Sequence, residues 1–125
     1  MQYMGSKNKI AKHLLPFILE RLKPDQHYVE PFVGGANMID KVDHPFRIGA
    51  DLNYHLIEMW RALQKGWQPP LNISKADHTY LKAAQDIEDP ALVAFVGFLC
   101  SFGGRWFNSY STNRKGDNYA DRGSR

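Results

Sequence analysis

The stretch YVEPFVGGAN, residues 28–37, places a run that favours a strand directly before an acid, Glu30. A proline and an aromatic residue follow, and then the pair Gly34 and Gly35. Glycine permits tight turns and close approach of a ligand to the backbone. The spacing is not GxGxxG, so an ordinary turn between a strand and a helix stays open as an equal alternative.

Hydrophobic periodicity on either side of this stretch predicts alternating helices and strands. Helices are expected at 6–22, with Ser6 as N-cap, and at 36–42, 53–65, 74–85 and 90–102; strands are expected at 27–30 and 46–50. The order helix, strand, helix, strand, helix predicts the α/β class with a parallel sheet.

Each predicted strand ends in an acid, Glu30 or Asp51, and the two lie 21 positions apart. Ligands of open parallel sheets bind outside the carboxyl ends of the strands, and an acid about 20 residues beyond a glycine turn accepts ribose hydroxyls in dinucleotide sites. The alternative is that both acids cap the following helices, a role that suits Asp51 just before a helix.

Composition limits the class of protein further. The 125 residues amount to about one small domain, and 43% hydrophobic residues are enough for a core. Cys100 is the single cysteine, so an internal disulfide is excluded. We expect its side chain to be buried in the core rather than to act as a reactive thiol. The sequence has no secretory or membrane-length apolar run, so we expect a cytoplasmic protein without a membrane partner.

The net charge of +3 arises entirely from residues 103–125, because residues 1–102 carry 11 basic and 11 acidic side chains. Aromatic residues are interleaved with the basic ones in this last segment. Such a pattern suits phosphates and unstacked bases. A solvated loop explains the charge equally well.

Four blocks, YMGSKNKI, YVEPFVGGAN, ADLNYHLIEMW and FLCSFGGRWF, together resemble the N-terminal half of Dam-type (D12 class) DNA adenine N6-methyltransferases. The resemblance extends from Tyr3 to about Tyr119. It implies a Rossmann-like methyltransferase fold, S-adenosylmethionine as methyl donor, double-stranded DNA as substrate and no metal. It also implies a role in DNA methylation, including restriction–modification.

The resemblance assigns roles residue by residue. Cofactor-binding residues would be Tyr3, Lys7, Glu30, Phe32, Gly34 and Asp51, with the glycine turn around the methionine portion and Asp51 on the ribose hydroxyls. DNA-binding residues would be Arg105, Phe107, Asn108, Tyr110, Arg114 and Lys115. Phe107, Asn108 and Tyr110 would wedge or stack at the displaced base, and the basic residues would contact phosphates or base edges.

The chain departs from the family at the catalytic motif, Asp-Pro-Pro-Tyr or a close variant. Its one proline pair, Pro69-Pro70, has Gln68 before it and Leu71 after it, so no catalytic residue is assigned. Transfer to an adenine amino group needs a proton acceptor and a pocket for the flipped base. We therefore expect an incomplete, N-terminal portion of the fold: residues 1–66 form the cofactor-binding part and 67–125 the helical segment and start of the DNA-recognition region, without the downstream catalytic portion.

Two other hypotheses stay open. One is a catalytically inactive fragment that binds DNA, cofactor or a partner protein, which the missing motif favours. The other is an enzyme that acts on another substrate, such as RNA, through the same cofactor loop. The YMGSK block counts against RNA, because that block accompanies the Dam type.

Overall fold

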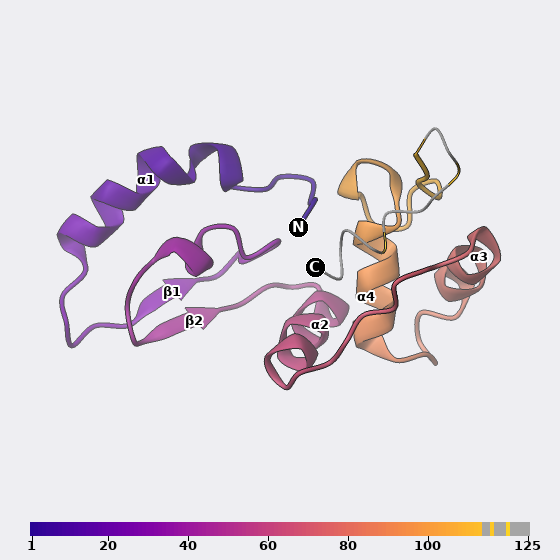
Figure 1. Cartoon of the computed structure of the whole chain (residues 1–125). Helices are drawn as coiled ribbons and strands as arrows, with labels where there is room; N and C mark the ends of the chain where they lie inside the picture. Colours follow the sequence, from indigo (N-terminus) through magenta and orange to yellow (C-terminus); the bar gives the residue numbers. More distant parts are fainter. Residues whose placement is uncertain (114–115, 117–119, 121–125) are drawn as a thin grey trace. The chain divides into compact units, whose positions relative to one another are not determined.

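The computed structural model describes residues 1–113, 116 and 120 and divides the chain into two compact units (Figure 1). The first unit comprises Gly5–Leu52 with Met1. The second comprises Gln2–Met4 and the chain from Asn53 onward. The chain thus passes from the second unit into the first after Met4 and returns after Leu52.

The first unit is a small α/β layer. It contains α1 (Asn8–Arg21), β1 (Tyr28–Glu30), the 3-10 turn η1 (Ile39–Lys41) and β2 (Arg47–Gly49). The two strands are parallel, with Tyr28 opposite Arg47 and Glu30 opposite Gly49. The predicted α/β class and parallel pairing are therefore confirmed for this unit, whereas a complete Rossmann-like sheet stays a prediction.

The core of this unit lies between α1 and the chain around η1. Buried Ala11, Met38 and Val42 form its centre, and Leu15, Ile18, Leu22 and Tyr28 pack against them. The apolar face of α1 predicted from periodicity thus covers this core through its later turns. Ile10 and Leu14 also recur at helical spacing within α1, but their side chains are exposed.

Two local predictions in this unit are wrong. The helix expected at 36–42 is reduced to η1, because Ala36 has a φ of 57°, which is incompatible with a right-handed helix at that point. Ser6 is not the N-cap of α1: Lys7 occupies that position without a side-chain cap, and Ser6 instead accepts a hydrogen bond from the Asn8 amide.

The second unit is helical around α4 (Pro90–Leu99), whose residues are nearly all buried. α2 (Tyr54–Gln64) and α3 (Lys75–Ala83) both pack against α4. Each of the three begins at a side-chain N-cap: Asn53 for α2, Ser74 for α3 and Asp89 for α4. Ser74 and Asp77 form a complete capping box, which fixes the start of α3.

The helix α4 ends earlier than predicted, and a separate 3-10 turn follows it. The helix ends at Leu99 rather than Phe102, because Ser101 is extended and pairs with Tyr110. A 3-10 turn, η2 (Phe102–Gly104), follows. Cys100 is fully buried at the helix end, and burial raises the pKa of its thiol to about 12, so the prediction of a packing cysteine is confirmed.

The compact units divide after Leu52, so α2 belongs to the helical unit. The functional division at residue 66 stays a prediction. Among the described residues, no helix has the length and hydropathy needed to span a membrane.

Candidate functional site

The carboxyl ends of the two strands hold Glu30 and Asp51 near each other. Beyond the strands the backbone ladder continues: the Ala50 amide donates to the Glu30 carbonyl at 2.9 Å, and the Val33 amide donates to the Ala50 carbonyl at 2.8 Å. The loop after β1 is therefore fastened to the chain that leads into Asp51. This arrangement places both acids at the edge where parallel sheets bind ligands.

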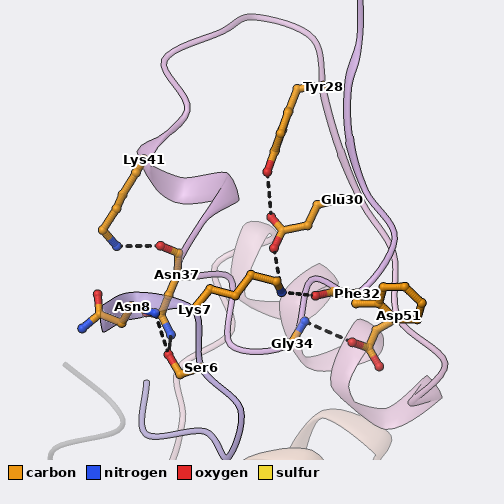
Figure 2. Close-up of polar contacts among 10 residues, drawn as sticks. All are labelled: Ser6, Lys7, Asn8, Tyr28, Glu30, Phe32, Gly34, Asn37, Lys41 and Asp51. Carbon is orange, nitrogen blue, oxygen red and sulfur yellow. Dashed lines mark hydrogen bonds and ion pairs between the residues drawn. The ribbon is translucent and has the colours of Figure 1, made fainter. Parts of the chain in front are cut away.

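Glu30 is 5% exposed, and its charge is compensated by Lys7. Lys7 Nζ lies 3.0 Å from Glu30 Oε1 and also donates a hydrogen bond to the Phe32 carbonyl (Figure 2). The Tyr28 hydroxyl donates a long hydrogen bond, 3.5 Å, to Glu30 Oε2. Burial, together with the charge of Glu30 and this hydrogen bond, raises the pKa of Tyr28, so the phenol stays protonated.

Asp51 binds the glycine turn directly. Its Oδ2 accepts a hydrogen bond from the Gly34 amide at 3.0 Å (Figure 2), and Gly34 has a φ of 50°. Asn53, not Asp51, caps α2, since its side chain accepts from the Leu56 amide at 2.9 Å. The alternative that Asp51 serves as a helix cap is therefore wrong.

The turn also packs closely on β2. A Cβ added to Gly49 would lie 2.9 Å from Val33 Cγ2, so a side chain at this strand position would displace the loop. Phe32 is 68% exposed at the tip of the turn. Its carbonyl is held by Lys7 while its ring faces solvent, an arrangement that suits contact with an apolar part of a ligand.

Sequence reasoning missed a second layer of support for Lys7. Ser6 Oγ accepts hydrogen bonds from Asn37 Nδ2 at 2.7 Å and from the Asn8 amide at 3.2 Å. Lys41 Nζ donates to the Asn37 carbonyl at 2.7 Å. The start of α1 is thus attached to the segment after the glycine turn (Figure 2). The polar side chain of Ser6 beside Lys7 is the one local sign of such support. Its partner Asn37 lies 31 positions away, and no local sequence pattern indicates the pairing.

Tyr3 lies in the second compact unit. Its ring packs against Phe98, with centroids 4.9 Å apart, and the next residue, Met4, donates its amide to the Gly104 carbonyl. The structure therefore gathers five of the six predicted cofactor residues in the first unit. Contact between Tyr3 and a cofactor stays a prediction.

The predicted DNA-contacting segment folds back on α4. Phe107 is 3% exposed and has a φ of 42°; its amide donates to the Gly97 carbonyl. A Cβ on Gly97 would lie 2.8 Å from Trp106 and 2.9 Å from Phe107, so the glycine admits both rings. In this conformation the Phe107 ring is packed inside the second unit, and its contact with a displaced base stays a prediction.

The other candidates of this segment differ in exposure. Arg105 is exposed, Asn108 is half-buried with its Nδ2 donating to the Phe102 carbonyl, and half-buried Tyr110 donates its hydroxyl to the Ile73 carbonyl at 2.5 Å. Arg114 and Lys115 lie outside the described residues. Contact of any of these residues with DNA stays a prediction.

A metal is not suggested by the part of the chain that the structure describes, where no three His, Cys, Asp or Glu side chains gather in a geometry for an ion. The first unit instead offers an acid at each strand end, a positive-φ glycine turn, a lysine at the loop and an exposed aromatic ring. These features fit a nucleoside-type cofactor with hydroxyl groups and an apolar ring.

The structure thus defines a class for the first unit: an α/β layer with a glycine turn and two acids at the carboxyl ends of parallel strands. Comparison with models of protein families identifies the family within this class. The model of the D12 class N6 adenine-specific DNA methyltransferases matches residues 3–90, and the chain belongs to this family. The family resemblance of the sequence is therefore confirmed over residues 3–90, and the block FLCSFGGRWF lies beyond the match. No match is found among the curated proteins.

Proposed function

We propose that this chain forms the cofactor-binding part of a DNA adenine N6-methyltransferase and binds S-adenosylmethionine at the turn between β1 and Asp51. The observation that carries the proposal is the hydrogen bond from the Gly34 amide to the Asp51 carboxylate at the carboxyl ends of the two parallel strands. Family membership supports methyltransferase chemistry on adenine in DNA. When bound, the cofactor supplies the methyl group.

Asp51 would hold the ribose hydroxyls. A carboxylate has about four lone-pair positions, so accepting the Gly34 amide is compatible with accepting two hydroxyls. Hydrogen bonds to an ionised carboxylate are stronger than neutral ones. The Gly34 bond also fixes the direction of the Asp51 side chain, which reduces the conformational entropy lost on binding.

Lys7, Glu30 and Phe32 would shape the remainder of the pocket. Lys7 neutralises Glu30 and holds the Phe32 carbonyl, so the loop keeps one conformation while the Phe32 ring stays exposed. Tyr3, from the YMGSK block, would complete the contact. The same proposal includes a larger Rossmann-like sheet around this unit and a cytoplasmic role in DNA methylation such as restriction–modification.

Double-stranded DNA would be the substrate, bound through the segment that begins at Arg105. Arg105 is exposed, and Arg114 and Lys115 add to the positive charge of this segment. Phosphate contacts by Lys and Arg supply most of the sequence-independent affinity of DNA-binding proteins. Asn108 and Tyr110 are the side chains of this segment that would reach bases.

A second candidate function is binding without catalysis. It is favoured by the absence of an Asp-Pro-Pro-Tyr-type sequence from the 125 residues. Such a chain would bind cofactor or DNA without methyl transfer.

The test of the proposed function is calorimetric titration of the intact chain with S-adenosylhomocysteine, which shares the ribose and adenine of the donor but cannot transfer a methyl group. We expect saturable binding together with slower exchange of the Gly34 amide hydrogen. Adenine alone serves as the control, because it lacks the hydroxyls that Asp51 would bind. Absence of saturable heat with a folded chain would refute the cofactor site.

A further inference from the structure

The N-terminal segment Gln2–Met4, here called the N-terminal clasp, is held within the second compact unit. The Met4 amide donates to the Gly104 carbonyl at 3.2 Å, and the Tyr3 ring packs on Phe98. Two blocks that are about 100 positions apart in the sequence, YMG and FGG, therefore form one packed structure.

Gly104 is the residue that admits the clasp. A Cβ at this position would lie 2.8 Å from the Gln2 carbonyl oxygen and 2.9 Å from both Gln2 C and Tyr3 N. All three are backbone atoms, which cannot rotate away as the end of a side chain can. Any other residue at position 104 would therefore displace the clasp.

The neighbouring glycine has the same backbone preference without the close approach. Gly103 has a φ of 71° and Gly104 a φ of 64°, so alanine is strained at both positions. A Cβ on Gly103 would meet nothing nearer than Arg105 Cγ at 3.9 Å. The pair therefore separates the effect of backbone strain from the effect of displacing the clasp.

The clasp is followed within three residues by the lysine that fixes the cofactor loop. Gly5 and Ser6 join Met4 to Lys7, and Lys7 binds Glu30 and the Phe32 carbonyl. Gly104, at the other side of the clasp, directly precedes Arg105, where the segment attributed to DNA contact begins. The short segment 2–7 is thus held at two points. Lys7 binds Glu30 and the Phe32 carbonyl, and Met4 binds Gly104, the residue before the segment attributed to DNA contact.

We propose that the clasp couples the two binding events: a cofactor on the loop held by Lys7 favours the clasped state at Gly104, and DNA bound beyond Arg105 favours it as well. The proposal rests on the proposed function, since it requires both ligands to bind. Ordering one end of a two-residue connection restricts the conformations open to the other end. Such coupling is reciprocal, so each ligand must raise the affinity for the other by the same factor.

The experiment measures the dissociation constant of S-adenosylhomocysteine with and without a short adenine-containing DNA duplex of mixed sequence. It compares the wild-type chain, Gly104→Ala, Gly103→Ala and a chain lacking residues 2–4. Wild type and Gly103→Ala should bind the cofactor product more tightly with DNA, by a factor within the usual range of about 5–150. Gly104→Ala and the shortened chain should show a factor near 1.

Amide exchange reports on the clasp directly and needs no affinity measurement. The Met4 amide should exchange faster in Gly104→Ala than in Gly103→Ala, and S-adenosylhomocysteine should slow it in the wild type. The shortened chain removes the clasp without straining residue 104, so it serves even where Gly104→Ala fails to fold. Because it also lacks Tyr3, a proposed cofactor contact, only the ratio of its two dissociation constants, with and without DNA, is compared with that of the wild type.

The outcomes separate the two proposals. No binding of S-adenosylhomocysteine to the wild type overturns the cofactor site and the coupling together. Binding of both ligands with a factor of 1 in the wild type overturns the coupling and leaves the cofactor site intact. An undiminished factor in the folded Gly104→Ala variant or in the shortened chain assigns the coupling to another segment and overturns the role of the clasp.

Discussion

Lys7 Nζ lies 3.0 Å from Glu30 Oε1, with the lysine side chain 31% exposed and the glutamate side chain 6% exposed. The carboxylate is thus nearly removed from water while its partner reaches solvent. A buried charge is costly unless it is paired, so the lysine stabilises the loop chiefly by removing that penalty. The relationship ties the start of α1 to the end of β1.

Replacing Lys7 with methionine should destabilise the first unit by about 1–3 kcal/mol, the cost of leaving a buried polar group without its partner. Methionine keeps most of the apolar stem, so packing changes little. Urea unfolding measures the loss, and faster exchange of the Ala50 amide, which donates to the Glu30 carbonyl, assigns it to this loop.

The matched control is Arg61→Met, which breaks the Arg61–Glu58 pair at 2.7 Å on α2. The Arg61 side chain is exposed, and such pairs along a helix contribute about 0.2–0.5 kcal/mol. Equal losses for Lys7→Met and Arg61→Met would show that the Glu30 charge is not effectively buried.

Asp51→Asn separates the structural role of Asp51 from its proposed ligand role. The asparagine carbonyl can still accept the Gly34 amide, so the turn should keep its conformation. Affinity for S-adenosylhomocysteine should fall by about 1.5–3 kcal/mol, because hydrogen bonds to a charged acceptor are lost. Calorimetry gives the affinity, and the exchange rate of the Gly34 amide shows whether the turn is intact. Unchanged affinity with an intact turn would remove Asp51 from the cofactor site.

The sequence predicts the placement of the acids and the glycine turn at the strand ends better than it predicts the contacts around them, and the reason is physical. Strand ends and glycine turns are local features, so the strand pattern alone places Glu30, Gly34 and Asp51 at the same edge of the sheet. The Ser6–Asn37 bond and the contact of Gly104 with Gln2 depend on residues far apart in the chain, which no local period reveals. The burial of Phe107 was missed for the same reason, since its packing depends on the missing side chain of Gly97.

His78 is a buried histidine, 4% exposed, that connects α3 to the end of α4. Its Nε2 lies 2.9 Å from Ser101 Oγ, and its ring packs against Phe107 and Tyr110. Burial lowers the pKa of His78 from its ordinary value of 6.5, and the charge of Lys82 on the same helix lowers it further. The neutral imidazole is therefore the form that the second unit stabilises.

Because the pKa of His78 is lower in the folded chain than in the unfolded one, the unfolded state binds more protons below about pH 6.5. The contribution of His78 to stability is therefore fully present above that pH and declines as the pH falls towards the folded pKa. Urea unfolding at a series of pH values should show this decline in the wild type and a smaller one in His78→Gln. Measurements stay above about pH 5, where most carboxylates are still ionised. Parallel profiles for the two chains would assign the decline to other groups.

DNA affinity should depend on salt through the basic residues of the last segment. Truncation at Gly104 is unsuitable as a test because it would remove the buried Phe107 and with it part of the core of the second unit. Charge replacement avoids this problem. Arg105→Gln, Arg114→Gln and Lys115→Gln should each weaken binding to a duplex, and each lost phosphate contact should reduce the log–log salt slope by about 0.9.

Lys65→Gln, on the chain just after α2, is the control for a general change of net charge. Fluorescence anisotropy of a labelled duplex at several salt concentrations gives the slopes. A slope that changes as much for Lys65→Gln as for the three replacements would mean that the last segment has no special part in DNA binding.

The 125-residue chain by itself should transfer no methyl group to DNA, even with saturating S-adenosylmethionine. The five residues gathered at the strand ends are suited to holding a donor, but the sequence contains no Asp-Pro-Pro-Tyr-type motif to accept the proton of the adenine amino group. Loss of positioned proton transfer reduces rates by about 10²–10⁴, and loss of alignment between the amino nitrogen and the methyl group reduces them further. Incorporation of labelled methyl groups into adenine-containing DNA is the measurement, with a family member that carries the motif as the positive control. Incorporation above background by the chain, with its mass verified, would mean that a proton acceptor lies within the 125 residues. Asp117 and Asp121, which lie outside the described part of the chain, would then be the first residues to replace with asparagine.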